Sequence, residues 1–180
     1  MNQPSPTVTV TPRATICYLA RDLQGFLEVC FAWKEKTPSA ERRKLHWKWT
    51  TYGGKVETSD PTIDFAARRE LYEESEVMAQ PNQMQKMAII TYRREGVEDC
   101  ECHIYIVRIP NAQPMPSREM TRPGWWKPTE LPAPMIDGDP WVIETIFSGK
   151  KIEGVMVRDQ NMKVILSETD LRIVDELSIP

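Results

Sequence analysis

The chain has 180 residues, which is enough for one domain with a buried core. Its formal net charge is -3 and 27% of its residues are charged, so neither stable nucleic-acid binding nor an anionic membrane surface is indicated. No apolar run reaches the roughly 18 residues of a membrane span, and the N-terminal residues lack the order of a signal peptide. We expect one cytoplasmic domain over residues 1–180, monomeric or homodimeric, with residues 1–12 flexible.

The first third of the chain predicts strands. Residues 14–20 (ATICYLA) and 26–33 (FLEVCFAW) are β-branched and aromatic runs separated by a turn, which indicates a strand pair. Residues 34–46 form a polar, basic loop in this interpretation, and residues 47–52 (WKWTTY) alternate as a strand does before Gly53-Gly54.

Residues 62–76 (TIDFAARRELYEESE) give the strongest helix signal in the chain. Asp60 or Thr62 can cap the helix, and Pro61 suits its beginning. Ile63, Ala67 and Leu71 form a narrow apolar stripe at helical spacing, so this face should pack on the core.

The rest of the chain predicts further strands and one more helix. Residues 84–93 and 101–109 are expected to be antiparallel strands, followed by a Pro-rich loop (110–124) and a short strand at 124–126. A second helix is predicted at 139–149 and a final hairpin at 151–158 and 162–166, while the tail 169–180 gives no clear pattern. This order indicates an α+β domain with a mixed sheet between helices.

The four cysteines carry no predicted function. Cys17 and Cys30 lie in apolar runs, as small core residues do. Cys100-Glu-Cys102 is too closely spaced and too isolated for a zinc site. We expect four reduced thiols.

Three carboxylates are central to the functional interpretation. Glu70, Glu73 and Glu74 are spaced i, i+3 and i+4, so they share one face of the predicted helix and repel one another. A solvated acidic face is the simplest explanation of such a cluster. Arg69 directly before it, and Gly53-Gly54-Lys55 one loop upstream, favour a site for a hard cation such as Mg²⁺. Magnesium in turn suits phosphate chemistry, in which a spare carboxylate can take a proton from water.

The same segment resembles the Nudix hydrolase signature, G-x5-E-x7-R-E-U-x-E-E-x-G-U, where U is bulky and aliphatic. The R-E-U-x-E-E core is intact from Arg69 to Glu74, and Gly53-Gly54-Lys55-Val56 is a typical beginning. Three positions depart from the signature: Asp60 replaces a glutamate, one extra residue precedes Arg69, and Glu76 replaces the glycine that ends the helix. A positive φ at Glu76 would cost about 1 kcal/mol, unless the helix continues past it.

The resemblance implies a set of roles in the metal site. The Gly53 carbonyl and the carboxylates of Glu70, Glu73 and Glu74 would bind Mg²⁺, with Mn²⁺ as a substitute, and Arg69 would orient the carboxylates. Lys55 would neutralise phosphate, although a solvated lysine is an equally simple interpretation.

The resemblance extends to the MutT-type subfamily that hydrolyses oxidised purine nucleoside triphosphates. Glu119, in PSREMTRPGWW, matches a glutamate that supplies a further metal ligand or base in that subfamily. In LPAPMIDGDPW, the residues Asp137, Asp139 and Trp141 match positions that hold the purine. Alternatively, Asp139 caps the following helix and Trp141 packs in the core.

Two further positions face the expected substrate. Thr50 stands where the subfamily has an asparagine that reads the base, which leaves the base preference open. Lys34, near the end of the second strand, could meet a triphosphate, whereas Arg42-Arg43-Lys44 either remain solvated or bind a larger ligand.

The sequence therefore predicts a Mg²⁺-dependent diphosphatase for a purine nucleoside triphosphate such as 8-oxo-dGTP, yielding the monophosphate and pyrophosphate. One alternative is an enzyme for another diphosphate, such as a nucleotide sugar, ADP-ribose or a dinucleoside polyphosphate. The other is a Nudix-fold module that binds nucleotides without catalysis.

Overall fold

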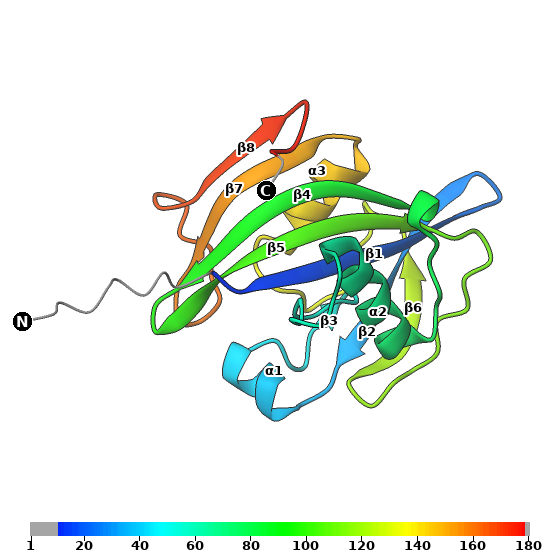
Figure 1. Cartoon of the computed structure of the whole chain (residues 1–180), viewed down its shortest axis with the longest axis horizontal. Coiled ribbons are helices and arrows are strands. Elements are labelled where there is room, and N and C mark those ends of the chain that lie inside the picture. Colours follow the sequence, from blue (N-terminus) through cyan, green and yellow to red (C-terminus); the bar gives the residue numbers. More distant parts are fainter. Residues whose placement is uncertain (1–10, 179–180) are drawn as a thin grey trace, which may run out of the picture.

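A mixed sheet of eight strands organises residues 11–178, the part of the chain that the computed structural model describes (Figure 1). The strands are β1 (Arg13–Leu23), β2 (Phe26–Lys34), β3 (Trp49–Thr50), β4 (Met84–Arg94), β5 (Val97–Arg108), β6 (Met120–Trp126), β7 (Lys151–Arg158) and β8 (Asp170–Val174). The helices are α1 (Pro38–Arg43), α2 (Ile63–Ser75) and α3 (Asp139–Phe147), with a 3₁₀ turn at Pro81–Gln83.

The strand order is β3-β2-β1-β5-β4-β7-β8, and β6 pairs with β2. The β1–β5 and β4–β7 pairs are parallel, whereas the other pairs are antiparallel. The expected strand pairs at 14–20 with 26–33 and at 84–93 with 101–109 are confirmed. The flexibility expected of residues 1–12 falls mostly outside the described residues, although the Pro12 carbonyl accepts a hydrogen bond from Glu101 N.

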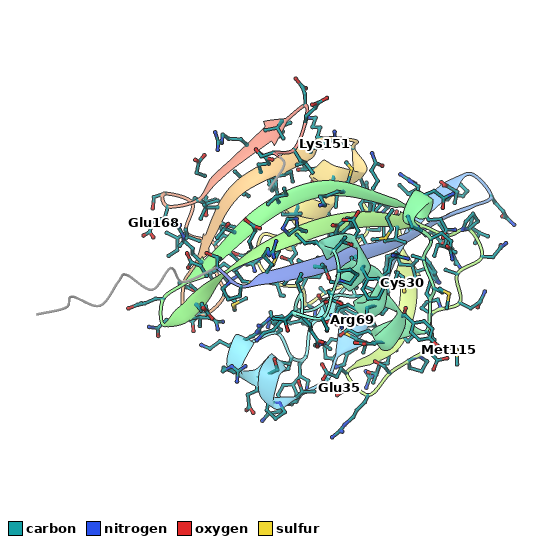
Figure 2. The ribbon with its side chains drawn as sticks, viewed as in Figure 1. Cys30, Glu35, Arg69, Met115, Lys151 and Glu168 are labelled. Carbon is teal, nitrogen blue, oxygen red and sulfur yellow. The ribbon has the colours of Figure 1, made fainter. Side chains whose placement is uncertain are left out.

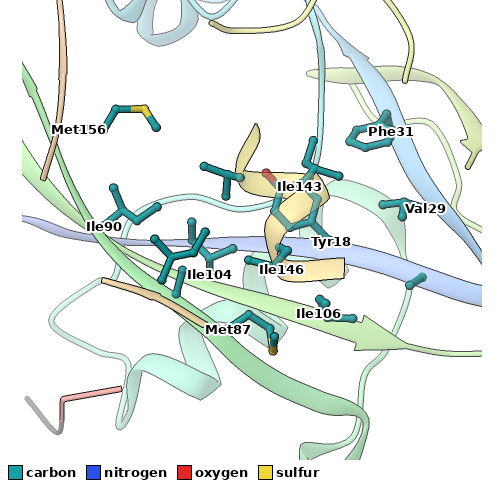
Figure 3. Close-up of a cluster of buried hydrophobic side chains, with 14 residues drawn as sticks. Tyr18, Val29, Phe31, Met87, Ile90, Ile104, Ile106, Ile143, Ile146 and Met156 are labelled. Atoms are coloured by element: carbon teal, nitrogen blue, oxygen red, sulfur yellow. The ribbon is translucent and has the colours of Figure 1, made fainter. Parts of the chain in front are cut away.

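Two hydrophobic clusters lie on opposite faces of the sheet. Along β1, Tyr18 and Ala20 belong to the cluster that α3 covers, and Cys17 and Leu19 belong to the cluster that α2 covers. This alternation follows from the two-residue period of a strand. Figure 3 shows the α3 cluster, in which Ile143 and Ile146 of α3 meet the strand side chains. The predicted mixed sheet between helices is therefore confirmed.

The segment after β3 runs beside the first half of β1. Thr15 N donates to the Gly54 carbonyl (2.8 Å), and Cys17 N donates to the Tyr52 carbonyl (2.7 Å). Because β2 pairs only with the second half of β1, this segment fills the edge that β2 leaves free. The two glycines are thus held against the centre of the sheet.

The basic segment 34–46 was expected to be a loop, which is wrong in part because it contains the short helix α1. Thr37 accepts a hydrogen bond from Ala40 N (3.2 Å) as the N-cap, and Pro38 follows at the first helical position. The helix ends where Lys44 adopts a left-handed conformation (φ 57°). These capping residues are visible in the sequence, but the segment lacks the apolar stripe by which an amphipathic helix is predicted.

Two predicted strands have different bounds. Only Trp49–Thr50 of the expected strand 47–52 is extended in the sheet, and Trp47 has a positive φ of 56°. In contrast, β6 begins at Met120, inside the segment expected to be a loop. Pro123 is tolerated within β6 because this strand pairs on one side only, with β2.

The expected final hairpin is also wrong in its second strand. Residues 162–166 make only the isolated bridge between Arg158 and Val164, and β7 pairs instead with β8, which lies in the tail that gave no pattern. β8 is mostly exposed, so it carries no alternation that the sequence could reveal. Among the described residues, no helix is long and apolar enough to cross a membrane.

Candidate active site

Helix α2 holds the acidic cluster. Thr62 caps the helix by accepting a hydrogen bond from Phe65 N (3.1 Å). Ala66, Ala67, Leu71 and Ser75 are buried, so they anchor one face of α2 against the sheet. The predicted helix and its apolar stripe are confirmed, and Figure 2 shows Arg69 on this helix, across the molecule from Lys151 and Glu168.

The two glycines contact two of the carboxylates directly. Gly53 N donates to Glu74 Oε2 across 2.8 Å. A Cβ on Gly54 would lie only 2.4 Å from Glu70 Oε2, so no other residue fits without displacing that carboxylate. At Gly53 (φ 141°), a Cβ would lie 2.1 Å from the Thr15 carbonyl oxygen. The loop therefore approaches both β1 and α2 as closely as only glycine allows.

Arg69 ties the loop to the helix. Its guanidinium donates to both carboxylate oxygens of Asp60 (3.0 and 2.9 Å), to Glu70 (3.0 Å) and to Glu73 (3.1 Å). It also donates to the Lys55 carbonyl (3.0 Å). The guanidinium holds the pKa of the Asp60 carboxyl below its usual range. Arg69 thus orients two acids of α2, and Asp60, which departs from the signature, holds Arg69.

Lys34, at the end of β2, joins α2 to the loop before β6. Its ammonium lies 2.8 Å from Glu74 Oε1 and 3.1 Å from Glu119 Oε2. Lys34 and Glu74 are mostly buried, whereas the Glu119 side chain is 47% exposed. Glu119, which was predicted to join the site from a distant loop, therefore lies near Glu74, because the Lys34 ammonium contacts both carboxylates.

The acids of this cluster differ in exposure and in their electrostatics. Burial raises the pKa of both Glu70 and Glu74, against the opposing effects of Arg69 and Lys34. Burial disfavours the charged form of Lys34, but the nearby carboxylates outweigh that effect and its pKa is raised. Glu73 is 55% exposed and, within the described part of the chain, pairs only with Arg69. Glu70 and Glu74 are therefore crowded anions, while Glu73 is open to solvent.

The side chains as they lie are held by cationic residues. Among the residues that the structure describes, no three acidic, histidine or cysteine side chains converge to hold a metal ion. The expected joint convergence of Glu70, Glu73 and Glu74 is not present in this arrangement, because Lys34 engages Glu74 and Arg69 engages the other two. The donor set nevertheless fits a hard divalent cation, since it consists of crowded carboxylate oxygens beside the Gly53–Gly54 backbone.

A cavity of about 240 Å³ adjoins this cluster. Lys34, Gly53 and Gly54 are part of its wall, so the acidic helix and the cavity share the glycine loop. Thr50, one of the predicted base-reading residues, also lines it. The remaining polar and aromatic residues of the wall come mainly from β1, β4, β5 and β7: Thr15, Tyr18, Arg43, Thr51, Tyr52, Tyr92, Arg93, Arg94, Glu98, Cys100, Cys102, Asp139 and Arg158.

Asp139 and Arg158 form a buried ion pair in the cavity wall. Arg158 donates from its NH2 group to Asp139 Oδ1 (2.7 Å) and from Nε to the Asp137 carbonyl (3.1 Å). Its guanidinium lies 4.7 Å from the ring centroid of Tyr92. Burial raises the pKa of Asp139, although Arg158 opposes the shift. Asp139 is the first residue of α3, and Gly138 occupies the N-cap, so the alternative that Asp139 caps the helix is wrong.

Three predicted substrate contacts lie outside the cavity wall. Asp137 accepts a hydrogen bond from Val164 N (2.8 Å), which pins the segment after β7. Trp141 is 44% exposed on α3, so it is neither a core residue nor part of the wall. Lys55 is exposed and contributes only its carbonyl to the Arg69 network.

The sequence did not indicate Tyr92 or Arg158 as site residues. Arg158 ends an alternating strand and Tyr92 lies within one, so each looked like an ordinary strand residue. Their joint position depends on the parallel pairing of β4 with β7, which no local pattern specifies.

Glu76, which stands where the signature has glycine, ends α2 in the way that the glycine would. The helix stops at Ser75, and Glu76 adopts a left-handed conformation (φ 59°) with its N–H donating to the Tyr72 carbonyl (2.7 Å). The alternative of a longer helix is wrong: glutamate occupies the backbone conformation that glycine favours.

Comparison with known proteins identifies the family. Residues 10–145 match the model of the NUDIX domain family. Over 86 residues the chain is 37% identical to an oxidized purine nucleoside triphosphate hydrolase from Danio rerio, covering 47% of this chain. The chain spans about half (53%) of the length of that curated relative.

Solved structures share the fold. A MutT mutator protein from Bacillus halodurans superposes with a TM-score of 0.68 at 20% identity, over 92% of this chain and 99% of the other. The NUDIX domain of NrtR from Shewanella oneidensis, complexed with ADP ribose, gives a TM-score of 0.54 at 14% identity, over 66% and 74% of the two chains.

Proposed function

Because this chain belongs to the NUDIX family, we propose that it is a Mg²⁺-dependent hydrolase that cleaves a purine nucleoside triphosphate to the monophosphate and pyrophosphate. The observation that carries the proposal is the contact of Gly53–Gly54 with both Glu74 and Glu70, next to a cavity whose wall includes Lys34 and Thr50. The 37% identity to the Danio rerio protein supports an oxidised purine nucleotide, such as 8-oxo-dGTP, as the substrate.

Glu70, Glu74 and the Gly53 carbonyl would hold the metal, with Glu73 and Glu119 as further ligands. Bound Mg²⁺ would neutralise charge on the phosphate oxygens, which is its general contribution to phosphoryl chemistry. Arg69 holds Glu70 and Glu73 in place, so both carboxylates are oriented before substrate arrives.

A carboxylate that is not used by the metal would accept the proton of the attacking water. Glu73 suits this role because it is the most exposed of the three clustered acids Glu70, Glu73 and Glu74. Glu119 is the second candidate, since it is about half exposed and its single ion-pair partner is Lys34. Lys34 would exchange its carboxylate partners for phosphate, and Lys55 would add charge at the outer side.

The base would enter the cavity and contact the part of its wall that Thr50, Asp139 and Arg158 form. Asp139 offers a carboxylate to a purine edge, and Thr50 offers a hydroxyl. The Tyr92 ring, which lies against the Arg158 guanidinium, provides the aromatic surface of this wall. Trp141 is exposed outside the wall, so it would contact the base only by moving toward the cavity. The Asp137 carboxylate would act here by holding the segment after β7 through Val164 N, while its backbone carbonyl accepts a hydrogen bond from Arg158 Nε.

The test is a nucleotide panel with Mg²⁺ in which phosphate and pyrophosphate are measured separately. The panel contains 8-oxo-dGTP, the ordinary triphosphates, ADP-ribose, a nucleotide sugar and a dinucleoside polyphosphate. Pyrophosphate release from a purine triphosphate is expected, and a wild-type protein that turns over no triphosphate would contradict the proposal. Cleavage of only the diphosphate compounds would favour the alternative substrate class.

Glu73→Gln separates an enzyme from a binding module. In an enzyme, this change should abolish turnover while nucleotide binding, measured by calorimetry, is retained. Glu144→Gln, on the exposed face of α3, is the matched control and should keep wild-type turnover. Binding of a nucleotide without turnover by the wild-type protein would favour the non-catalytic module.

A further inference from the structure

Cys100 and Cys102 form a pair of thiols on one face of β5. Residues two apart on a strand point to the same side, and the Cys102 Sγ–H donates to Cys100 Sγ across 3.9 Å. Both residues line the cavity described above, and Cys100 is only partly buried. All four cysteines are free thiols, as expected, but only Cys100 and Cys102 line the cavity.

The other two cysteines do not line the cavity. Cys17 and Cys30 are fully buried, in the core on the α2 side of the sheet. Burial raises the pKa of the Cys17 thiol far above its usual range and that of Cys30 to about 11. These two thiols are protonated and inaccessible, so they provide an internal reference within the same chain.

The surroundings of Cys100 favour its thiolate. The hydrogen bond from Cys102 lowers the pKa of Cys100 to about 7, and the positive charges of Arg43 and Lys55 act in the same direction, against burial and Glu98. The pKa of Cys102 is raised well above its usual value, so its thiol stays protonated and acts as the donor. One nucleophilic sulfur and one proton-donating sulfur thus face the same cavity.

We propose that Cys100 and Cys102 form a peroxide-reactive dithiol site in the cavity wall, with Cys100 as the nucleophile and Cys102 as the resolving thiol. This site goes beyond the proposed nucleotide hydrolysis and does not depend on it.

The chemistry has two steps. The Cys100 thiolate attacks one oxygen of a hydroperoxide; the O–O bond breaks, the sulfur becomes a sulfenic acid, and the second oxygen leaves as hydroxide or alkoxide and takes a proton from solvent. The Cys102 sulfur then attacks the Cys100 sulfur, a disulfide forms, and the hydroxyl leaves as water with the Cys102 proton. The peroxide is reduced by two electrons, which the two thiols supply.

The two sulfurs are already 3.9 Å apart, and closing the bridge requires β5 to bend locally. Two residues of an extended strand span about 6.6–6.8 Å between Cα atoms, which is the upper end of the range that a disulfide bridges. A bridge at that limit is readily reduced, so the modification is reversible by thiols.

The expected gain in reactivity is moderate. At pH 7, a thiol with a pKa near 7 is about half ionised, whereas one with a pKa near 9 is about 1% ionised, a ratio of about 50. The lower nucleophilicity of the more acidic thiol removes about eightfold of this, which leaves Cys100 about sixfold faster than an ordinary thiol. The buried reference cysteines should be far slower still.

The experiment treats the full-length wild-type protein with hydrogen peroxide at pH 7, blocks the remaining thiols, and maps all four cysteines by mass spectrometry. Cys100 and Cys102 lie in one tryptic peptide, from Glu95 to Arg108, which should become lighter by two hydrogens and recover with a dithiol reductant. Cys17 and Cys30 should remain reduced. In Cys102→Ser, a sulfenic acid trapped by a dimedone reagent is expected at Cys100, and Cys100→Ser should lose the reaction.

Three results would overturn the proposal. One is a wild-type peptide that keeps both thiols while a small free thiol in the same tube is oxidised. Another is equal oxidation of Cys17 and Cys30, and the third is unchanged oxidation of Cys102 in Cys100→Ser. The wild-type map depends on no variant, so a variant that fails to fold leaves the test intact.

Discussion

Lys34 donates to the Glu74 carboxylate across 2.8 Å, and both side chains are nearly nine-tenths buried. The same ammonium reaches Glu119, so one lysine of β2 neutralises two acids that the proposed function assigns to the metal. Lysine and metal are therefore alternative sources of positive charge at one place.

Lys34→Met should destabilise the metal-free protein by about 3 kcal/mol, because it leaves a buried carboxylate without its partner. Mg²⁺ should restore much of this loss, so the rise in Tm on adding Mg²⁺ should be larger in the variant than in the wild type. Lys36→Met, which removes an exposed ion pair with Glu41 (2.7 Å), is the control and should leave stability nearly unchanged, because solvent screens this pair. Equal Mg²⁺ effects in all three proteins would contradict the prediction.

Gly54→Ala should weaken metal binding without unfolding the protein. The atoms nearest to the new Cβ are the carboxylate atoms of the flexible Glu70 side chain, which can move away but then leaves its place beside the loop. We expect about a 10- to 100-fold loss of Mn²⁺ affinity in calorimetry and little change in Tm. Gly53→Ala would instead meet the Thr15 backbone and should lower Tm strongly. Wild-type metal affinity in Gly54→Ala would refute the assigned role of Glu70.

Glu76→Gly should stabilise the chain by about 0.5–1 kcal/mol, because glycine adopts the left-handed end of α2 without steric cost. Glu76→Ala removes the same exposed side chain but keeps the Cβ, so it should bring no comparable gain. The measurement is urea denaturation. A gain of the same size in both variants would mean that the side chain, and not the backbone conformation, causes the effect.

Asp139→Asn should raise KM for the purine substrate by about 10- to 100-fold, which corresponds to one charged hydrogen bond to the base. Asp137→Asn is the matched comparison, since its carboxylate holds Val164 N outside the cavity wall. This second variant should lower Tm and change KM by less than about threefold. The reverse pattern in steady-state kinetics would exchange the two roles.

His103 should make the fold sensitive to acid. Its side chain is fully buried, Nδ1 has no hydrogen-bond partner among residues 11–178, and burial lowers its pKa below the usual value of 6.5, against the effect of Glu101. The unfolded chain therefore binds the proton more readily, so stability is lost as the pH falls from about 6.5 toward the lower folded pKa. In His103→Gln, unfolding free energies measured across this range should vary less with pH. An unchanged pH dependence would assign the effect to other groups.

Local patterns accounted for much of the site. The i, i+3, i+4 spacing placed Glu70, Glu73 and Glu74 on one turn, and the capping residue Thr62 and the apolar stripe defined α2, because each of these signals arises within a few residues of chain. The strand pair before the glycine loop followed from β-branched runs for the same reason.

Contacts between distant segments were decided only by the tertiary structure. The sequence could not show that Lys34 and Glu119 meet at Glu74, that Arg158 pairs with Asp139, or that Trp141 stays at the surface. These relationships depend on strand order and register, which are set by the packing of the whole sheet and its two faces. The three carboxylates Glu70, Glu73 and Glu74 lie within one helix, so the sequence alone placed them together. Their charge partners and the cavity wall come from segments that only folding brings together.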